Sequence, residues 1–223
     1  MGEDRHPAQQ PKVIAIDGPA AAGKGTLARR LAAHLGYAYL DTGLLYRAVG
    51  MKALSRADGL EPADAAWAAE TLSEADLARA DLRGDVAAGA ASRVAAMPAV
   101  RAALLSFQRR FAERPPGDAP GAVLDGRDIG TVVCPQAPIK LFVTAALDVR
   151  AERRLKELRD RGLEAIDSRV LRDMQERDVR DSSRAVAPLE PASDAIVIDT
   201  SGLDPDAVFA AAMAAIATAV SSR

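Results

Sequence analysis

The fold is decided by Gly18-Pro-Ala-Ala-Ala-Gly-Lys-Gly-Thr26, which directly follows the apolar run Lys12-Val-Ile-Ala-Ile-Asp17. The apolar run predicts a strand that is buried on both faces, as in a parallel sheet. Leucines spaced four residues apart predict a helix from Lys24 to Leu35, and Gly36 ends it. A Gly-x4-Gly-Lys sequence between a strand and a helix is typical of a phosphate-binding P-loop.

The small residues of this loop let the backbone wrap a phosphate group. Its N–H groups then point inward, and the helix that follows presents its positive end. Lys24 adds a full charge near the β- and γ-phosphates of a nucleoside triphosphate. A Ser or Thr usually follows that lysine directly, but here Gly25 does, so we assign the Mg²⁺-side hydroxyl to Thr26 and leave most of the coordination to water and phosphate oxygens. The predicted nucleotide-binding residues are Gly18, Pro19, Ala20, Ala21, Ala22, Gly23, Lys24, Gly25 and Thr26.

The rest of the chain alternates strands and helices. Further strands are predicted at 37–40, 121–125, 139–143 and 195–199, with a helix at 44–54 and a charged helical region at 148–180. This alternation predicts an α/β three-layer sandwich around a five-stranded parallel sheet. We expect a P-loop core made of residues 12–54 and 121–223, with an Arg-rich lid at about 160–190. Residues 55–120 form a helical insertion and a Pro-rich linker, and residues 1–11 form a flexible tail.

Composition narrows the class of protein. The 223 residues carry a net charge of −2, with 49% apolar and 27% charged residues, which is ordinary for a globular chain and argues against a bulk nucleic-acid binder. No apolar run approaches the ~20 residues of a membrane helix, and the first ten residues do not resemble a signal peptide. One cysteine, Cys134, cannot form an internal disulfide, so we expect a cytoplasmic protein. Aromatic residues make up only 4%, which argues against RNA binding by stacking.

Arginine is concentrated in one region. Of 29 basic residues only five are Lys, and ten of the arginines fall between Arg150 and Arg184. Arg suits bidentate contact with phosphate. Polar segments also follow predicted strands at 41–47 and 125–130, and a third, at 177–188, spaces its arginines along one helix face. Alternatively, these side chains serve as a helix cap, core residues, a surface ion pair or a solvated face.

Together these segments resemble the bacterial cytidylate kinases, which are nucleoside monophosphate kinases. The resemblance rests on the P-loop stretch and on Leu40-Asp-Thr-Gly-Leu-Leu-Tyr-Arg47, Ala91-Ser-Arg-Val-Ala-Ala96 with Val100-Arg101, Asp125-Gly-Arg-Asp-Ile-Gly-Thr-Val-Val133 and Arg177-Asp-Val-Arg-Asp-Ser-Ser-Arg-Ala-Val-Ala-Pro-Leu189. The segments run in the family's order and span nearly the whole chain. They favour this family over an adenylate or shikimate kinase type and over a nucleotide sensor without turnover.

The resemblance implies transfer of the ATP γ-phosphate to CMP or dCMP, with Mg²⁺ as cofactor and no polymer or membrane partner; we expect a monomer. Arg153, or alternatively Arg154, would lie near ATP. The cytosine amino group would face Asp128 or Ser92. The implied CMP-binding residues are Thr42, Tyr46, Arg47, Ser92, Arg101, Arg127, Asp128, Asp181 and Arg184. The implied catalytic residues are Lys24, Arg127, Arg177 and Arg180.

One feature departs from the family. Its members often carry a small three-stranded sheet in the insertion, before the segment equivalent to Leu82-Arg83. Here only Thr71 to Asp81 precedes that segment, and it has no strand pattern. We therefore expect the acceptor clamp to consist of helices alone.

Overall fold

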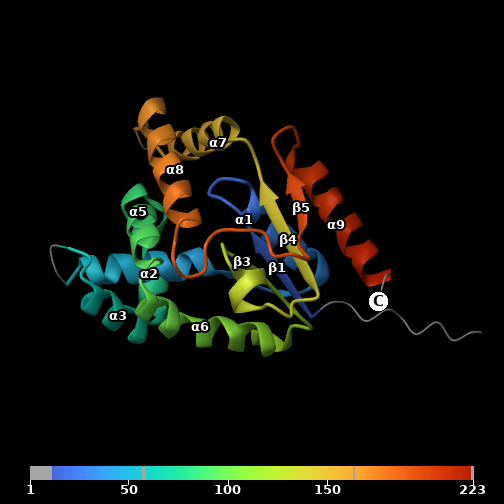
Figure 1. The fold of residues 1–223 in the computed structure, drawn as a ribbon, viewed down its shortest axis with the longest axis horizontal. Helices are drawn as coiled ribbons and strands as arrows, with labels where there is room; N and C mark the ends of the chain where they lie inside the picture. Colours follow the sequence, from blue (N-terminus) through green and yellow to red (C-terminus); the bar gives the residue numbers. More distant parts are fainter. Residues whose placement is uncertain (1–11, 57–58, 163, 222–223) are drawn as a thin grey trace, which may run out of the picture.

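The computed structural model describes residues 12–56, 59–162 and 164–221, so the predicted tail at 1–11 lies outside the described residues. Five parallel strands form one sheet in the order β2-β3-β1-β4-β5, and this confirms the predicted α/β fold (Figure 1). The strands are β1 (Val13–Asp17), β2 (Ala38–Asp41), β3 (Ala122–Asp125), β4 (Ile139–Thr144) and β5 (Ile196–Asp199).

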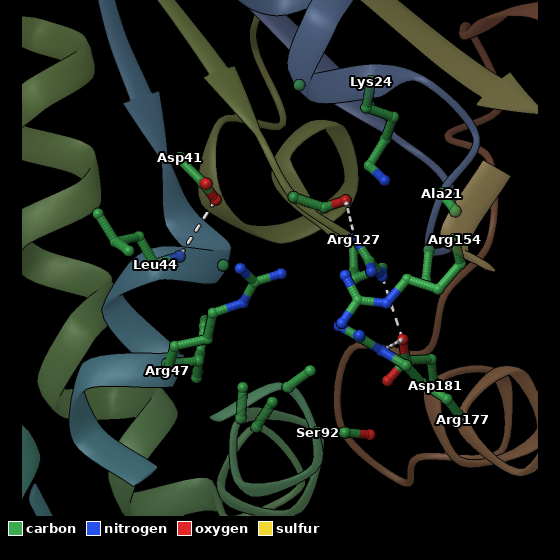
Figure 2. Close-up of a pocket in the computed structure, with 18 of the residues that line it drawn as sticks. Ala21, Lys24, Asp41, Leu44, Arg47, Ser92, Arg127, Arg154, Arg177 and Asp181 are labelled. Carbon is green, nitrogen blue, oxygen red and sulfur yellow. Dashed lines mark hydrogen bonds and ion pairs between the residues drawn. The ribbon is translucent and has the colours of Figure 1, made fainter. Parts of the chain in front are cut away.

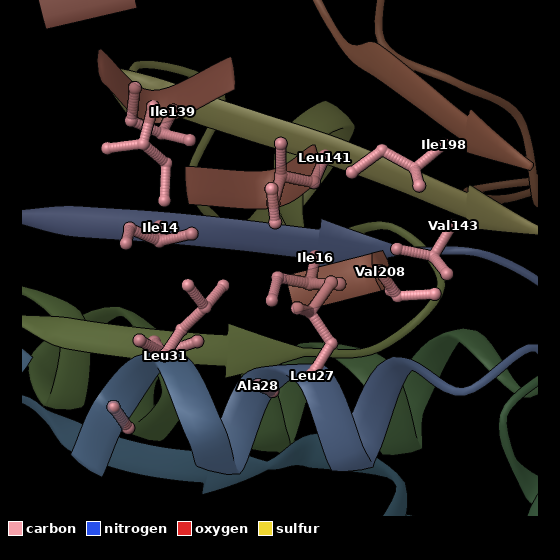
Figure 3. Packing of buried hydrophobic residues seen from close by; sticks show 14 of the residues in the cluster. Ile14, Ile16, Leu27, Ala28, Leu31, Ile139, Leu141, Val143, Ile198 and Val208 are labelled. Carbon is pink, nitrogen blue, oxygen red and sulfur yellow. The ribbon is translucent and has the colours of Figure 1, made fainter. Parts of the chain in front are cut away.

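The central strand β1 is buried on both faces because its side chains alternate between two cores. Ile14 and Ile16 pack against α1 (Lys24–Leu35) and α9 (Pro205–Ser221), as Figure 3 shows for α1. Ala15 points to the other face, where α6 (Pro98–Glu113) and the short helix η3 (Ile129–Val133) cover the sheet. The three layers follow directly from this alternation.

The chain between β2 and β3 is helical where the structure describes it. It contains α2 (Thr42–Leu54), α3 (Pro62–Glu70), α4 (Glu74–Leu77), η1 (Ala80–Arg83), α5 (Asp85–Val94), α6 and η2 (Pro116–Asp118), and no strand among the described residues. An Ala-rich core of its own holds these helices together. A Cβ added to Gly50 would lie 2.7 Å from the Cβ of Ala90, so α2 and α5 pack closely only because glycine stands there.

The charged helical region predicted at 148–180 consists of two helices, α7 (Leu147–Asp160) and α8 (Asp167–Ser182). Gly162 lies between them with a φ of +71°, a conformation that glycine adopts readily and that breaks a helix. The other predicted boundaries differ by one or two residues; for example, the second helix begins at Thr42 and not at Leu44. None of the described helices combines the length and the apolar content needed to cross a membrane.

Candidate active site

A pocket of about 570 Å³ lies at the carboxyl ends of β1, β2 and β3. The P-loop, the start of α2, helices α5, α7 and α8 and the turn after β3 all contribute to its walls. Most of the predicted site residues line it: Ala20, Ala21, Gly23, Lys24, Gly25, Thr26, Thr42, Tyr46, Arg47, Ser92, Arg101, Arg127, Asp128, Arg177, Arg180, Asp181 and Arg184. Gly18, Pro19, Ala22 and Arg153 do not line this pocket.

The P-loop is shaped by its glycines. A Cβ on Gly18, whose φ is +143°, would lie 1.9 Å from the carbonyl oxygen of Val143, so only glycine fits. Helix α1 begins directly after Gly23, and no side chain caps it. Its first N–H groups therefore remain for an anion, as a P-loop requires.

Lys24 is buried, and its Nζ donates to the carbonyl oxygen of Pro19 at 2.8 Å. Burial lowers the pKa of this lysine well below its usual range, and the guanidinium of Arg127 lowers it further, whereas the carboxylate of Asp125 opposes the shift. A lysine held in this way gains more from an incoming phosphate than an exposed one does, because burial removes the water that would otherwise solvate its charge.

Asp125 is a site residue to which the sequence analysis assigned no role, although it stands in the quoted segment that ends β3. Burial raises the pKa of its carboxyl group, and the nearby charge of Asp41 adds to that rise. The hydroxyl of Tyr39 donates to Asp125 Oδ2 at 2.8 Å. Asp125 and Thr26 line the same pocket, and their oxygen atoms are of the kind that Mg²⁺ prefers.

A group of arginines surrounds Asp181, as Figure 2 shows. Arg127 Nε donates to Asp181 Oδ2 at 3.1 Å, and Arg177 Nε lies 3.8 Å from the same oxygen. Burial by itself would raise the pKa of Asp181, but Arg127, Arg177 and Arg184 outweigh it and lower that pKa. One carboxylate thus stands among three guanidinium groups.

This surplus of positive charge favours the binding of an anion. Burial lowers the pKa of Arg177, and its neighbour Arg127 lowers it further, so the charge is held there at a cost that an anion would relieve. In the part of the chain that the structure describes, Nε of Arg177 and one terminal nitrogen of Arg184 have no hydrogen-bond partner. Figure 2 shows Arg47 on the opposite wall of the same pocket.

The far end of the pocket is polar and buried. Arg101 of α6 forms an ion pair with Asp128, the residue before η3, and both side chains are buried. The guanidinium of Arg101 also approaches the hydroxyl of Tyr46 at 3.4 Å. Arg180 of α8 donates to Ser92 Oγ of α5 at 2.9 Å. This end therefore offers both acceptors and donors to a polar ring.

The insertion and the α7–α8 region meet across the pocket. Arg154 of α7 pairs with Asp85 at the start of α5, and Arg161 donates to the carbonyl oxygen of Arg83 at 3.0 Å. The hydrogen bond from Arg180 to Ser92 adds a third contact between the two regions. Helices α5 and α8 accordingly contact each other, and Figure 1 shows them as neighbours.

The side chain of Asp41 has a local role. It accepts a hydrogen bond from the N–H of Leu44 at 3.1 Å and so caps α2, which was one of the alternatives considered for this segment. This cap fixes the start of the helix that carries Thr42, Tyr46 and Arg47. The hydroxyl of Thr42 in turn donates to the carbonyl oxygen of Asp125 at 2.8 Å.

A second hollow of about 370 Å³ lies on the other side of the P-loop. Arg153 borders it and donates to the hydroxyl and carbonyl oxygens of Thr200 at 2.9 and 2.6 Å. The neighbouring Arg154 lines the main pocket instead, so the two arginines serve different hollows. The sequence analysis missed Thr200, Leu203 and Val208, which also border the second hollow, because no pattern links the region after β5 to a loop more than 170 residues earlier.

Comparison with known proteins identifies close relatives. The sequence model of the family described as cytidylate kinase matches residues 14–218. A cytidylate kinase of Paramagnetospirillum magneticum is 70% identical over 207 residues, which cover 92% of this chain and 97% of the relative. A cytidylate kinase of Rhodospirillum rubrum is 59% identical over 204 residues, covering 90% of this chain and 95% of the relative.

Solved structures show the same fold at low identity. A gluconokinase from Sinorhizobium meliloti superposes with a TM-score of 0.52 and 16% identity, covering 96% of this chain and 97% of the gluconokinase. At that identity the likeness concerns the fold alone.

Proposed function

The chain belongs to the cytidylate kinase family, which transfers the γ-phosphoryl group of ATP to CMP or dCMP, and we propose how its pocket divides that work. The observation that carries the proposal is a single pocket with two sites for anions. A P-loop with a buried lysine forms one, and the arginines around Asp181 form the other. Phosphoryl transfer between two nucleotides needs such a pair of sites facing each other.

At the ATP end, the triphosphate would follow the P-loop and its γ-phosphate would meet Lys24. The adenine ring would occupy the second hollow, whose lining is largely apolar and includes Leu203 and Val208. Arg153 would border that ring, and Arg154 would face the phosphates from the main pocket. Mg²⁺, when bound, would help neutralise the phosphate charge, and the oxygen atoms of Thr26 and Asp125 are the side-chain groups that would hold it, directly or through water.

At the acceptor end, three groups of side chains would share the nucleotide. The acceptor phosphate would meet guanidinium groups, the sugar would meet the residues at the end of α8, and the base would lie against the buried polar residues. The assignments are Arg47, Arg127 and Arg177 for the phosphate, Asp181 and Arg184 for the sugar, and Thr42, Tyr46, Ser92, Arg101 and Asp128 for the base. Arg180 would stabilise charge on the transferring group, for which its side chain would have to leave the hydroxyl of Ser92.

The chemistry then needs no general base from the protein. The nucleophile is an oxygen of the acceptor phosphate, whose second pKa is about 6, so the group is mostly dianionic near neutral pH. Lys24 and the arginines would stabilise the charge that spreads over the transferring phosphoryl group. The contacts between α5 and the α7–α8 region would keep water from competing with the acceptor.

Base preference would follow from the buried ion pair of Arg101 and Asp128. A pocket arranged for the donor and acceptor groups of cytosine leaves buried polar atoms unsatisfied when uracil enters. Each lost partner costs ~1–3 kcal/mol, which corresponds to ~5- to 150-fold in affinity. We therefore expect CMP and dCMP to be preferred over UMP.

A panel of acceptors tests the proposal. ADP release from ATP and Mg²⁺ is measured with CMP, dCMP, UMP, AMP, GMP and no acceptor. We expect fast turnover with CMP and dCMP, slow turnover with UMP and almost none otherwise. Turnover with a purine acceptor would contradict the base assignments, and binding of ATP without any turnover would favour a nucleotide sensor.

We also propose that the protein acts as a monomer and in the cytoplasm, a reducing compartment that suits a single cysteine without an internal disulfide partner. Light scattering at working concentrations tests the first point. A dimer whose dissociation abolishes turnover would overturn it.

A further inference from the structure

The end of β1 holds the turn that follows β3. The N–H of Gly126 donates to the carbonyl oxygen of Ile16 at 2.9 Å. The carboxylate of Asp17 accepts the N–H of Ile129 with Oδ1 and the N–H of Gly130 with Oδ2, each at 2.7 Å. Ile16 and Asp17, two consecutive residues of β1, therefore accept three hydrogen bonds that fix the backbone on both sides of Arg127 and Asp128.

The carboxylate fits its place closely. Asp17 is only 5% exposed. A Cβ added to Gly130 would lie 3.4 Å from Asp17 Oδ2 and 3.1 Å from Cδ of Lys140, so the turn lies directly on both side chains. Both oxygens of the carboxylate are used, and an isosteric amide could satisfy only one of the two N–H groups.

Burial of the Asp17 carboxylate costs folding free energy. Burial raises the pKa of Asp17 to about 6, against the opposing effect of the two backbone hydrogen bonds. The charged groups that face it are Asp128, which adds to the rise, and Lys24, which opposes it. The thiol of Cys134 is also near enough to feel its charge. Sheet stability alone favours an apolar residue at such a position.

Asp17 is also connected through the main chain to the P-loop. It precedes Gly18, the first residue of the P-loop, and its side chain carries the turn that presents Arg127 and Asp128 to the acceptor. Asp128 in turn pairs with Arg101 at the base end of the pocket. One residue thus joins the loop that binds the donor nucleotide to the turn that contacts the acceptor.

We propose that Asp17 is a positioning residue that sets Arg127 and Asp128 against the P-loop and thereby maintains acceptor affinity and the choice of base. The proposal rests on the acceptor roles given above to Arg127 and Asp128. In this proposal Asp17 contacts neither nucleotide. It acts through its hydrogen bonds to the backbone of Ile129 and Gly130.

The test compares Asp17→Asn with the wild-type protein in steady-state kinetics for CMP, UMP and ATP. The amide presents an N–H₂ group to a backbone N–H, so the turn loses one anchor. We expect KM for CMP to rise at least tenfold and the ratio of kcat/KM for CMP over UMP to fall at least threefold. KM for ATP should change less than twofold, which a general loss of structure would not produce.

Asp204→Asn is the control for loss of a carboxylate charge outside the main pocket. Asp204, at the start of α9, accepts the N–H groups of Asp206 and Ala207 at 2.9 and 2.8 Å, both with Oδ1, so the amide can keep both bonds. We expect its CMP-to-UMP ratio to equal that of the wild type. A similar fall in both variants would overturn the proposal.

Asp128→Asn separates this inference from the proposed function. If Asp128→Asn leaves the base ratio unchanged, the base assignment itself fails. If Asp128→Asn lowers the ratio and Asp17→Asn does not, the positioning role fails and the base assignment stands.

Should Asp17→Asn not fold, the wild-type CMP-to-UMP ratio between about pH 5.5 and 8, where the cytosine ring stays almost entirely unprotonated, serves instead. Protonation takes one acceptor from the carboxylate, so we expect the ratio to fall as the pH drops through about 6. The acceptor phosphates of CMP and UMP titrate alike and cancel in the ratio. A flat ratio would overturn the proposal.

Discussion

The two ends of the main pocket are built in opposite ways. The P-loop end comes from nine consecutive residues and uses backbone N–H groups with a single charged side chain, Lys24. The acceptor end draws side chains from segments between residues 41 and 184, and most of them are charged and paired. We therefore expect that a substitution in the P-loop end abolishes activity without lowering the folding stability, whereas one at the acceptor end lowers both.

Removal of Asp181 should have the largest effect. In Asp181→Ala three guanidinium groups lose their buried counter-ion, which costs about 3–5 kcal/mol of folding free energy and lowers Tm by roughly 6–20 °C. Thermal melting with and without sulfate measures this change in Tm. Sulfate should stabilise the variant more than the wild type, because the anion replaces the missing carboxylate.

The control for this variant is Asp206→Ala, which breaks an exposed ion pair with Arg30 and should barely change Tm. Equal Tm values for Asp181→Ala and the wild type would show that the arginines do not depend on that carboxylate.

Loss of the P-loop cation should give the opposite pattern. In Lys24→Met the buried charge disappears, so Tm should stay the same or rise, whereas kcat should fall about 10²- to 10³-fold. Coupled measurement of ADP formation gives kcat, and calorimetry with CMP alone should show unchanged acceptor binding. A drop in kcat of less than threefold would show that Lys24 is not a catalytic residue.

Arg184→Ala should affect only one substrate. A hydrogen bond to a charged group contributes about 1.5–3 kcal/mol, so KM for CMP should rise about tenfold or more while KM for ATP changes less than twofold. Initial rates over a grid of both substrates separate the two constants. Equal increases in both would contradict the placement of Arg184 at the acceptor sugar.

The smallest effect should come from the contact that joins the two ends. Asp85→Asn weakens its ion pair with Arg154, in which the Asp85 side chain is 60% exposed, so the change should be about 0.2–1 kcal/mol, or less than fivefold in kcat/KM. The loss should shrink as ionic strength rises. Asp81→Asn, whose ion pair with Arg79 stays at the start of η1, is the control and should show no loss.

The fold could be predicted from patterns among residues that are close in the sequence. The apolar run before Gly18 and the leucine spacing after it predicted β1 and α1 because burial on both faces and helical periodicity are visible in consecutive residues. The charged helical region predicted at 148–180 consists of two helices, α7 and α8, because Gly162 with its positive φ divides a charged pattern that otherwise continues. Charge and spacing do not reveal that break.

The sequence alone determined the phosphate-binding loop, since its backbone, its glycines and its lysine are neighbours in the chain. It also indicated which polar segments matter, through the resemblance to a family. Only the tertiary structure decided which charges meet: that Arg154 and not Arg153 faces the main pocket, that Asp125 lies buried beside Lys24, and that Asp17 carries the turn after β3. The physical reason is that ion pairs and buried hydrogen bonds depend on distances across the sheet and between helices, and no periodicity in the chain encodes those distances.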